Sequence, residues 1–157
     1  MPLKDLLSRE RIAVLDSPAD RDAVLDAAAR LLADDADASP PIAECLRQRE
    51  RLGSTAIGHG VAIPHGRCNA FADARAAFLR LSTPVDFDAV DGEPVDLVFA
   101  MTVPEHFAQQ HLQLLSELAE RFADPAFRAA LRAAPLADSA RWRSAASAAT
   151  SAPVRFS

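Results

Sequence analysis

A histidine between a proline and a glycine is the residue of this sequence best suited to covalent chemistry. His65 follows Pro64, which restricts the local backbone, and precedes Gly66, which leaves the approach to the imidazole ring open. A neutral imidazole nitrogen can attack an electrophile and form a covalent intermediate, and an acceptor at the other ring nitrogen then fixes the tautomer. The same pattern fits a loop histidine that makes a structural hydrogen bond, and spacing alone leaves both interpretations open.

Two other side chains could support such a histidine. Arg49 follows Cys45 by four positions and shares its helical face. It could extend over the edge of the core or direct its planar donors at an oxyanion or a backbone carbonyl. His111 is either a half-buried core histidine or a second imidazole that faces His65 and donates to a phosphoryl oxygen. It belongs to an apolar stripe at helical spacing with Phe107, Leu115, Leu118 and Phe122.

The remaining polar candidates do not form a metal or nucleotide site. The hydroxyls of Ser54 and Thr55 lie beside glycines, where they either cap a turn or meet a bound anion. The four histidines are not spaced as metal ligands, and Cys45 and Cys68 lack CxxC or Cys/His zinc spacing. Neither GxxxxGK[ST] nor GxGxxG occurs. We therefore expect no metal, no cofactor and reduced thiols.

Composition excludes several classes of protein. The 157 residues fit one domain, half of them apolar and a quarter charged. The net charge of −5 argues against binding to nucleic acid, which requires a basic face. No apolar run approaches the roughly 20 residues that cross a bilayer, and the charged N-terminus lacks a signal core. We expect a cytoplasmic protein without membrane insertion.

The elements that must position the candidate residues alternate between strand and helix. A strand is predicted over residues 11–15, followed by a helix that Ser17-Pro18 opens and that runs to about residue 34. A second helix begins at Ser39-Pro40-Pro41. The density of glycine between Gly53 and Gly66 predicts loop, with a short strand around residues 61–63.

The second half of the chain repeats this alternation. Strands are predicted over residues 76–81 and 95–103, and the second is apolar enough to be buried on both faces. Pro104 opens a helix to Phe122, and Asp124-Pro125 starts another through Leu131. Alternating helices and strands predict an α/β fold with a central sheet, formed by residues 1–135 as a single domain. Residues 136–157 are rich in Ala, Ser and Arg, and we expect one short helix containing Trp142 and then a disordered tail.

The segment around His65 reads Arg49-Glu-x-x-Gly-Ser-Thr-x-x-Gly-x-Gly-x-Ala-Ile-Pro-His65-Gly. This pattern resembles the phosphorylation-site signature of a known family, the mannitol/fructose-type IIA domains of the phosphoenolpyruvate-dependent phosphotransferase system. The resemblance extends over about residues 3–134, and the phrase Phe87-Asp-Ala-Val-Asp is most similar to the nitrogen-regulatory branch. Two positions depart from the family pattern, since His59 stands where Asn is common and Arg67 where Lys is common.

The resemblance implies a fold, a reaction and partners. The fold would be a single α/β domain with a mixed central β-sheet flanked by helices. His65 would accept a phosphoryl group on Nε2 from the phosphohistidine of an HPr-like carrier, with His111 and Arg49 in support and without a metal or nucleotide. The residues close to the phosphate would be Ser54, Thr55 and Gly66.

Three functions remain open at this stage. The first is a regulatory phosphocarrier whose phosphorylation state controls target proteins, a potassium transporter or a sensor kinase among the candidates. The second is a sugar-specific IIA component that passes phosphate to a IIB domain. The third is a binding module that acts without phosphorylation, although the joint presence of Arg49, His65 and His111 argues against it. The sequence also leaves open whether the chain forms a homodimer and what the tail does.

Overall fold

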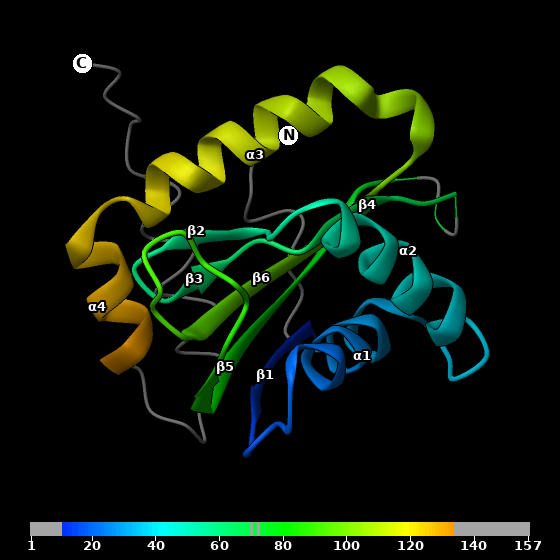
Figure 1. Cartoon of the computed structure of the whole chain (residues 1–157). Coiled ribbons are helices and arrows are strands. Elements are labelled where there is room, and N and C mark those ends of the chain that lie inside the picture. Colours follow the sequence, from blue (N-terminus) through cyan, green and yellow to red (C-terminus); the bar gives the residue numbers. More distant parts are fainter. Residues whose placement is uncertain (1–10, 70, 72, 134–157) are drawn as a thin grey trace.

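The structure is a computed structural model that describes residues 11–69, 71 and 73–133 (Figure 1). The first half contains β1 (Ile12–Leu15), α1 (Arg21–Leu32), α2 (Ser39–Leu52), β2 (Ala56–Gly58), β3 (Val61–Ala62) and β4 (His65–Arg67). The second half contains β5 (Arg75–Val85), β6 (Val95–Val103), the short 3-10 helix η3 (Glu105–Phe107), α3 (Ala108–Phe122) and α4 (Pro125–Ala133).

The six strands form one mixed sheet built around β6. The order β1-β5-β6-β3-β2 combines parallel pairs, β1 with β5 and β6 with β3, with antiparallel pairs, β5 with β6 and β2 with β3. Strand β4 also runs parallel to β6, so residues 61–67 follow one edge of this central strand. The predicted mixed sheet in a single α/β domain is confirmed.

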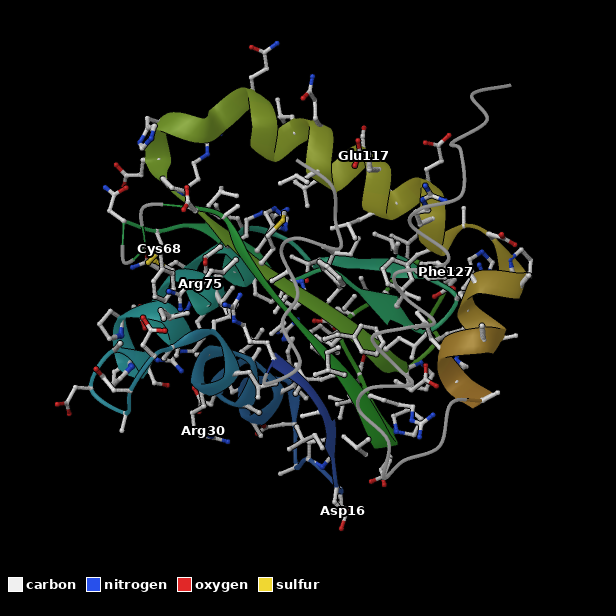
Figure 2. The ribbon with its side chains drawn as sticks, turned by 180° about the vertical axis from the view of Figure 1, so that it is seen from behind. Asp16, Arg30, Cys68, Arg75, Glu117 and Phe127 are labelled. Atoms are coloured by element: carbon white, nitrogen blue, oxygen red, sulfur yellow. The ribbon has the colours of Figure 1, made fainter. Side chains whose placement is uncertain are left out.

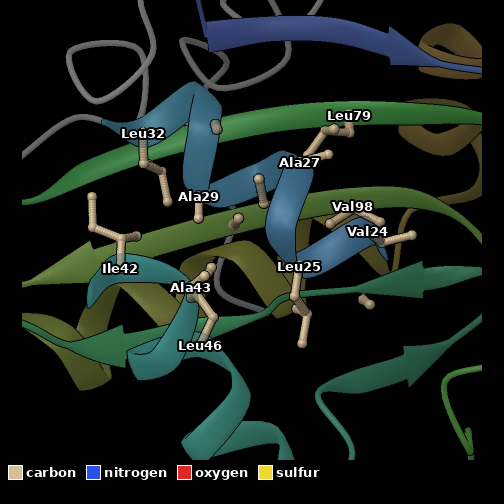
Figure 3. Close-up of a cluster of buried hydrophobic side chains, with 14 of the residues drawn as sticks. Val24, Leu25, Ala27, Ala29, Leu32, Ile42, Ala43, Leu46, Leu79 and Val98 are labelled. Atoms are coloured by element: carbon tan, nitrogen blue, oxygen red, sulfur yellow. The ribbon is translucent and has the colours of Figure 1, made fainter. Parts of the chain in front are cut away.

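Helices cover both faces of the sheet. Side chains of α1 and α2 pack with one set of alternating strand residues, which includes Ala62, Val98 and Ala100 (Figure 3). Side chains of α3 and α4 pack with the other set, which includes Leu97 and Met101. Strand β6 is therefore buried on both faces, as its apolar sequence predicts.

Several predicted boundaries are wrong. Helix α1 does not begin at Ser17: Asp20 is its N-cap and accepts a hydrogen bond from the amide of Ala23 at 2.8 Å. Ser17 instead has a left-handed φ of 45°, and its amide donates to the hydroxyl of Ser82 at 2.8 Å. The strand predicted over 76–81 extends over Arg75–Val85, and the helix expected from Pro104 starts at Ala108 after η3.

Some expectations fall outside the described residues. They include the C-terminal segment 136–157, the helix expected around Trp142 and the domain boundary near residue 135. In the part of the chain that the structure describes, every helix is too short or too polar to span a membrane.

Candidate functional site

The position of His65 is fixed by the central strand. Pairing of β4 with β6 places His65 opposite Met101, whose amide donates to the carbonyl of Pro64 at 2.9 Å. The amide of Cys68 donates to the carbonyl of Val103 at 2.8 Å. His65 was predicted to lie in a loop, and it lies instead on a short strand. Its neighbours satisfy backbone hydrogen bonds along a buried strand, which holds the imidazole on a rigid element.

The imidazole of His65 has different environments at its two nitrogens. Nδ1 lies 2.8 Å from the carbonyl oxygen of Ile63, so it carries the proton and donates it there. Nε2 accepts from Nε of Arg49 at 3.2 Å. Burial lowers the pKa of His65 below its ordinary value of 6.5, and the positive charge of Arg49 adds to this, although the bond to Ile63 opposes it. The ring is therefore neutral at pH 7, with the lone pair on Nε2.

Arg49 connects the end of α2 to this ring. Its Nη1 donates to the carbonyl of Gly53 at 2.9 Å while its Nε faces His65. The two contacts orient the guanidinium plane, and they correspond to the donor interpretation of Arg49 rather than to a side chain that only covers the core. The arrangement places a fixed positive charge beside Nε2.

Glu50 is a buried anchor to which the sequence interpretation assigned no role. Its side chain is 3% exposed and accepts from both the amide of Thr55, at 3.1 Å, and the hydroxyl of Thr55, at 2.6 Å. Arg21 of α1 lies 3.8 Å away and also pairs with Asp88 at 3.3 Å. The carboxylate thereby ties the loop after α2 to the helix that carries Arg49. Its position next to Arg49 in the signature was the only signal.

The hydroxyls of Ser54 and Thr55 donate away from His65 in this structure. Thr55 donates to Glu50, as described above. The hydroxyl of Ser54 donates to the carbonyl of Phe87 and accepts from the amide of Ala56 at 3.1 Å. Both hydroxyl protons are thus used within the loop, so either side chain would have to change its donor bond to contact a phosphoryl group.

Gly66 allows α2 to approach β4 closely. A Cβ at this position would lie 3.3 Å from both the Cβ and the carbonyl oxygen of Cys45. The thiol of Cys45 lies 3.7 Å from the carbonyl of Arg67, and burial, with a hydrogen bond to Cys68, raises the pKa of Cys45 to about 12. Cys45 is therefore a protonated packing residue rather than a nucleophile.

A groove of about 840 Å³ opens beside His65, between α2 and α3. In Figure 1, β4 lies between these two helices. The residues that line the groove are Cys45, Gln48, Arg49, Arg51, Leu52, His65, Gly66, Arg67, Leu112 and Leu115. His111 belongs to α3, one turn before Leu115, but its side chain is outside the described part of the structure.

His59 lies apart from this groove, and the described residues also offer no metal site. His59 is exposed at a turn with a left-handed φ of 58°, its amide donates to Asp91 at 2.9 Å, and it does not line the groove. Within residues 11–69, 71 and 73–133, no group of three or more His, Cys, Asp or Glu side chains is arranged to hold a metal.

Residues 5–141 match the family described as "Phosphoenolpyruvate-dependent sugar phosphotransferase system, EIIA 2". The chain belongs to this family. The resemblance seen in the sequence is therefore confirmed at the level of the family.

Curated relatives are named nitrogen regulatory proteins. The one from Bradyrhizobium diazoefficiens is 38% identical over 134 residues, which cover 85% of this chain and 88% of that protein. The one from Pseudomonas aeruginosa is 47% identical over 97 residues, covering 62% of this chain and 63% of that protein. The chain thus matches less than two thirds of the length of the second relative.

Solved structures agree with the fold. The crystal structure of nitrogen regulatory protein IIA-Ntr from Neisseria meningitidis superposes with a TM-score of 0.80 at 38% identity, over 90% of this chain and 97% of that one. The mannitol IIA of Escherichia coli has a TM-score of 0.67 at 20% identity, over 85% and 95% of the two chains. The second similarity supports the fold alone.

Proposed function

We propose that this family member is a phosphocarrier that accepts a phosphoryl group on Nε2 of His65. The observation that carries the proposal is the pair of contacts on one ring: Nδ1 donates to Ile63, and Nε2 faces Arg49. A lowered pKa keeps the ring neutral, which a nucleophile requires. Membership of the family supports a phosphohistidine on an HPr-like carrier as the donor.

The transfer exchanges one phosphorus–nitrogen bond for another. The lone pair on Nε2 of His65 attacks phosphorus, the bond to the carrier's histidine breaks, and that electron pair returns to the carrier's ring nitrogen. The proton on Nδ1 stays in its bond to Ile63 throughout. As the phosphoryl group arrives, the guanidinium of Arg49 moves its donation from Nε2 to the equatorial oxygens, where charge is spread in the transition state.

The names of two relatives favour a regulatory role, which we propose for the cytoplasm. The proteins from Bradyrhizobium and Pseudomonas are both named nitrogen regulatory proteins, so we propose that phosphorylation of His65 changes which target this chain binds. A phosphoryl group adds roughly −1.5 to −2 charges at one point of the groove, enough to change a binding surface. Transfer to a IIB domain is the second candidate, because the family that the chain matches is described as part of a sugar phosphotransferase system.

Intact mass measures the proposed chemistry directly. The protein is incubated with phosphoenolpyruvate, an enzyme I and an HPr-like carrier, beside the variant His65→Gln. One acid-labile phosphoryl group on the wild type and none on the variant is the expected result. A folded variant that is labelled at the wild-type rate would place the acceptor elsewhere. Rapid onward transfer to a IIB domain would favour the sugar-specific alternative.

A further inference from the structure

The groove beside His65 is positively charged, although the whole chain carries a net charge of −5. Its lining contains three arginines and no Asp or Glu. Arg67 is exposed and makes no ion pair with any residue that the structure describes. Arg51 is 64% exposed and has Glu44 as a partner at 3.3 Å. Positive charge therefore remains available to a molecule that enters the groove.

Exposed leucines border the same groove. Leu52 at the end of α2 is 85% exposed, and Leu112 on α3 is 63% exposed. Single exposed apolar residues are ordinary on protein surfaces. These two line one groove together with His65, however, and they come from the helices on either side of it. A small hydrated anion would not bury the apolar surface of the two leucines, whereas a docked protein surface would bury it.

The two kinds of arginine in the groove have different tasks. Arg49 is half-buried, and its donors already contact His65 and the carbonyl of Gly53. Arg51 and Arg67 are exposed, and the guanidinium of Arg51 contacts Glu44. Arg49 is thus suited to the phosphoryl group, and the outer two arginines are suited to charges that surround it.

We propose that Arg51, Leu52, Arg67 and Leu112, here called the rim, dock a phosphorylated carrier whose histidine is surrounded by acidic and apolar side chains. This inference rests on the proposed function and specifies the chemistry of the donor. Opposite charges at an interface rim mainly raise the association rate, so the rim selects an acidic carrier over one with a basic docking face.

The test compares two phosphoryl donors of very different size. The variant R51E/R67E reverses both exposed charges and leaves His65 and Arg49 in place. Phosphoramidate, a small donor, reports the chemistry at His65 alone, while a phosphorylated HPr-like carrier with acidic residues around its histidine reports docking as well. The measured quantity is the ratio of the two second-order labelling rates, carrier over phosphoramidate.

We expect this ratio to fall at least tenfold in R51E/R67E at low salt. In 1 M NaCl the difference from wild type should shrink below threefold, because the Debye length decreases from about 10 Å at 0.1 M to about 3 Å. The control Arg30→Glu reverses one arginine charge on α1, on the side of the molecule away from α3 (Figure 2), and should leave the ratio unchanged. Circular dichroism and thermal unfolding verify that each variant is folded.

A carrier with reversed charges, tested against the wild type and R51E/R67E, completes a double-mutant cycle across the proposed interface. Replacing the acidic residues around its histidine with lysine should slow transfer to the wild type and restore at least part of the rate with R51E/R67E. An unchanged ratio in R51E/R67E would overturn the docking proposal, as would an equal fall with both donors, which would mean that the arginines act on the phosphoryl group. Failure of both donors to label the wild type would instead overturn the proposed function.

Discussion

Replacing the buried carboxylate of Glu50 should destabilise the protein far more than replacing an exposed one on the same helix. In Glu50→Ala the amide and the hydroxyl of Thr55 lose their acceptors, at 3.1 and 2.6 Å. Thr55 is 5% exposed, so water does not readily replace them. Each unpaired donor costs about 1–3 kcal/mol. The pair with Arg21 at 3.8 Å adds little, because that arginine is a third exposed.

The expected loss of unfolding free energy, summed over the two donors, is therefore about 2–6 kcal/mol. Urea denaturation followed by circular dichroism measures it, and an m-value of about 2 kcal/mol/M converts a loss of about 3 kcal/mol into a midpoint shift of about 1.5 M. Glu50→Gln retains one acceptor oxygen but directs an amide NH₂ at the other donor, so it should cost about 1–2 kcal/mol.

Glu44→Ala is the matched control. Glu44 lies on α2 as well, but its side chain is 45% exposed; it pairs with Arg47 and Arg51 at 3.3 Å each and accepts a long hydrogen bond from Gln48 at 3.4 Å. Exposed pairs of this kind contribute about 0–1 kcal/mol. If Glu50→Ala and Glu44→Ala unfold within about 1 kcal/mol of each other, the hydrogen bonds of Glu50 do not anchor the loop.

Three further predictions concern the histidine and its neighbours. Arg49→Gln should raise the pKa of His65, because a positive charge is removed, and should slow phosphoryl acceptance by about 10²–10³-fold; an NMR titration of the ring and rapid-quench labelling measure the two effects. Gly66→Ala should cost about 1–3 kcal/mol, since its Cβ meets Cys45 at 3.3 Å, whereas Gly53→Ala meets no atom within 4 Å and should be near neutral in thermal unfolding. His65 has a lower pKa folded than unfolded, so the unfolded chain binds more protons between the two values; stability should fall as pH drops from 6.5 through the folded pKa, and His65→Gln should lose that pH dependence.

Clear local sequence patterns predicted the elements that matter most for the fold. The nine residues of β6 are almost all apolar, so burial on both faces followed from composition. The start of α1 was not predictable in the same way, since both Ser17 and Asp20 are good N-caps. The choice depends on Ser82, 65 positions away, whose hydroxyl accepts from the amide of Ser17. Long-range contacts of this kind are absent from local sequence patterns.

In the candidate site, too, local patterns predicted some features, whereas those that depend on long-range contacts were not predictable. Spacing singled out His65, but the contact that decides its tautomer comes from the carbonyl of Ile63, and backbone carbonyls carry no sequence signal. Arg49 was equally compatible with covering the core, and its contact with His65, sixteen positions away, depends on how α2 crosses β4. Glutamate is an ordinary residue on a helix surface, and only the burial of Glu50 reveals its role.

On the proposed mechanism, transfer itself weakens the attraction that brings the donor in. Before transfer the groove lining carries the charges of Arg49, Arg51 and Arg67 without a carboxylate. The phosphoryl group then adds about −1.5 to −2 charges beside Arg49, which leaves roughly one positive charge of the three. An acidic carrier that has given up its own phosphoryl group faces a groove with less positive charge, so it should dissociate faster than the phosphorylated carrier does before transfer. The phosphorylated surface, still bordered by Leu52 and Leu112, is then open to a partner with weaker negative charge, so one groove can distinguish donor from target by charge alone.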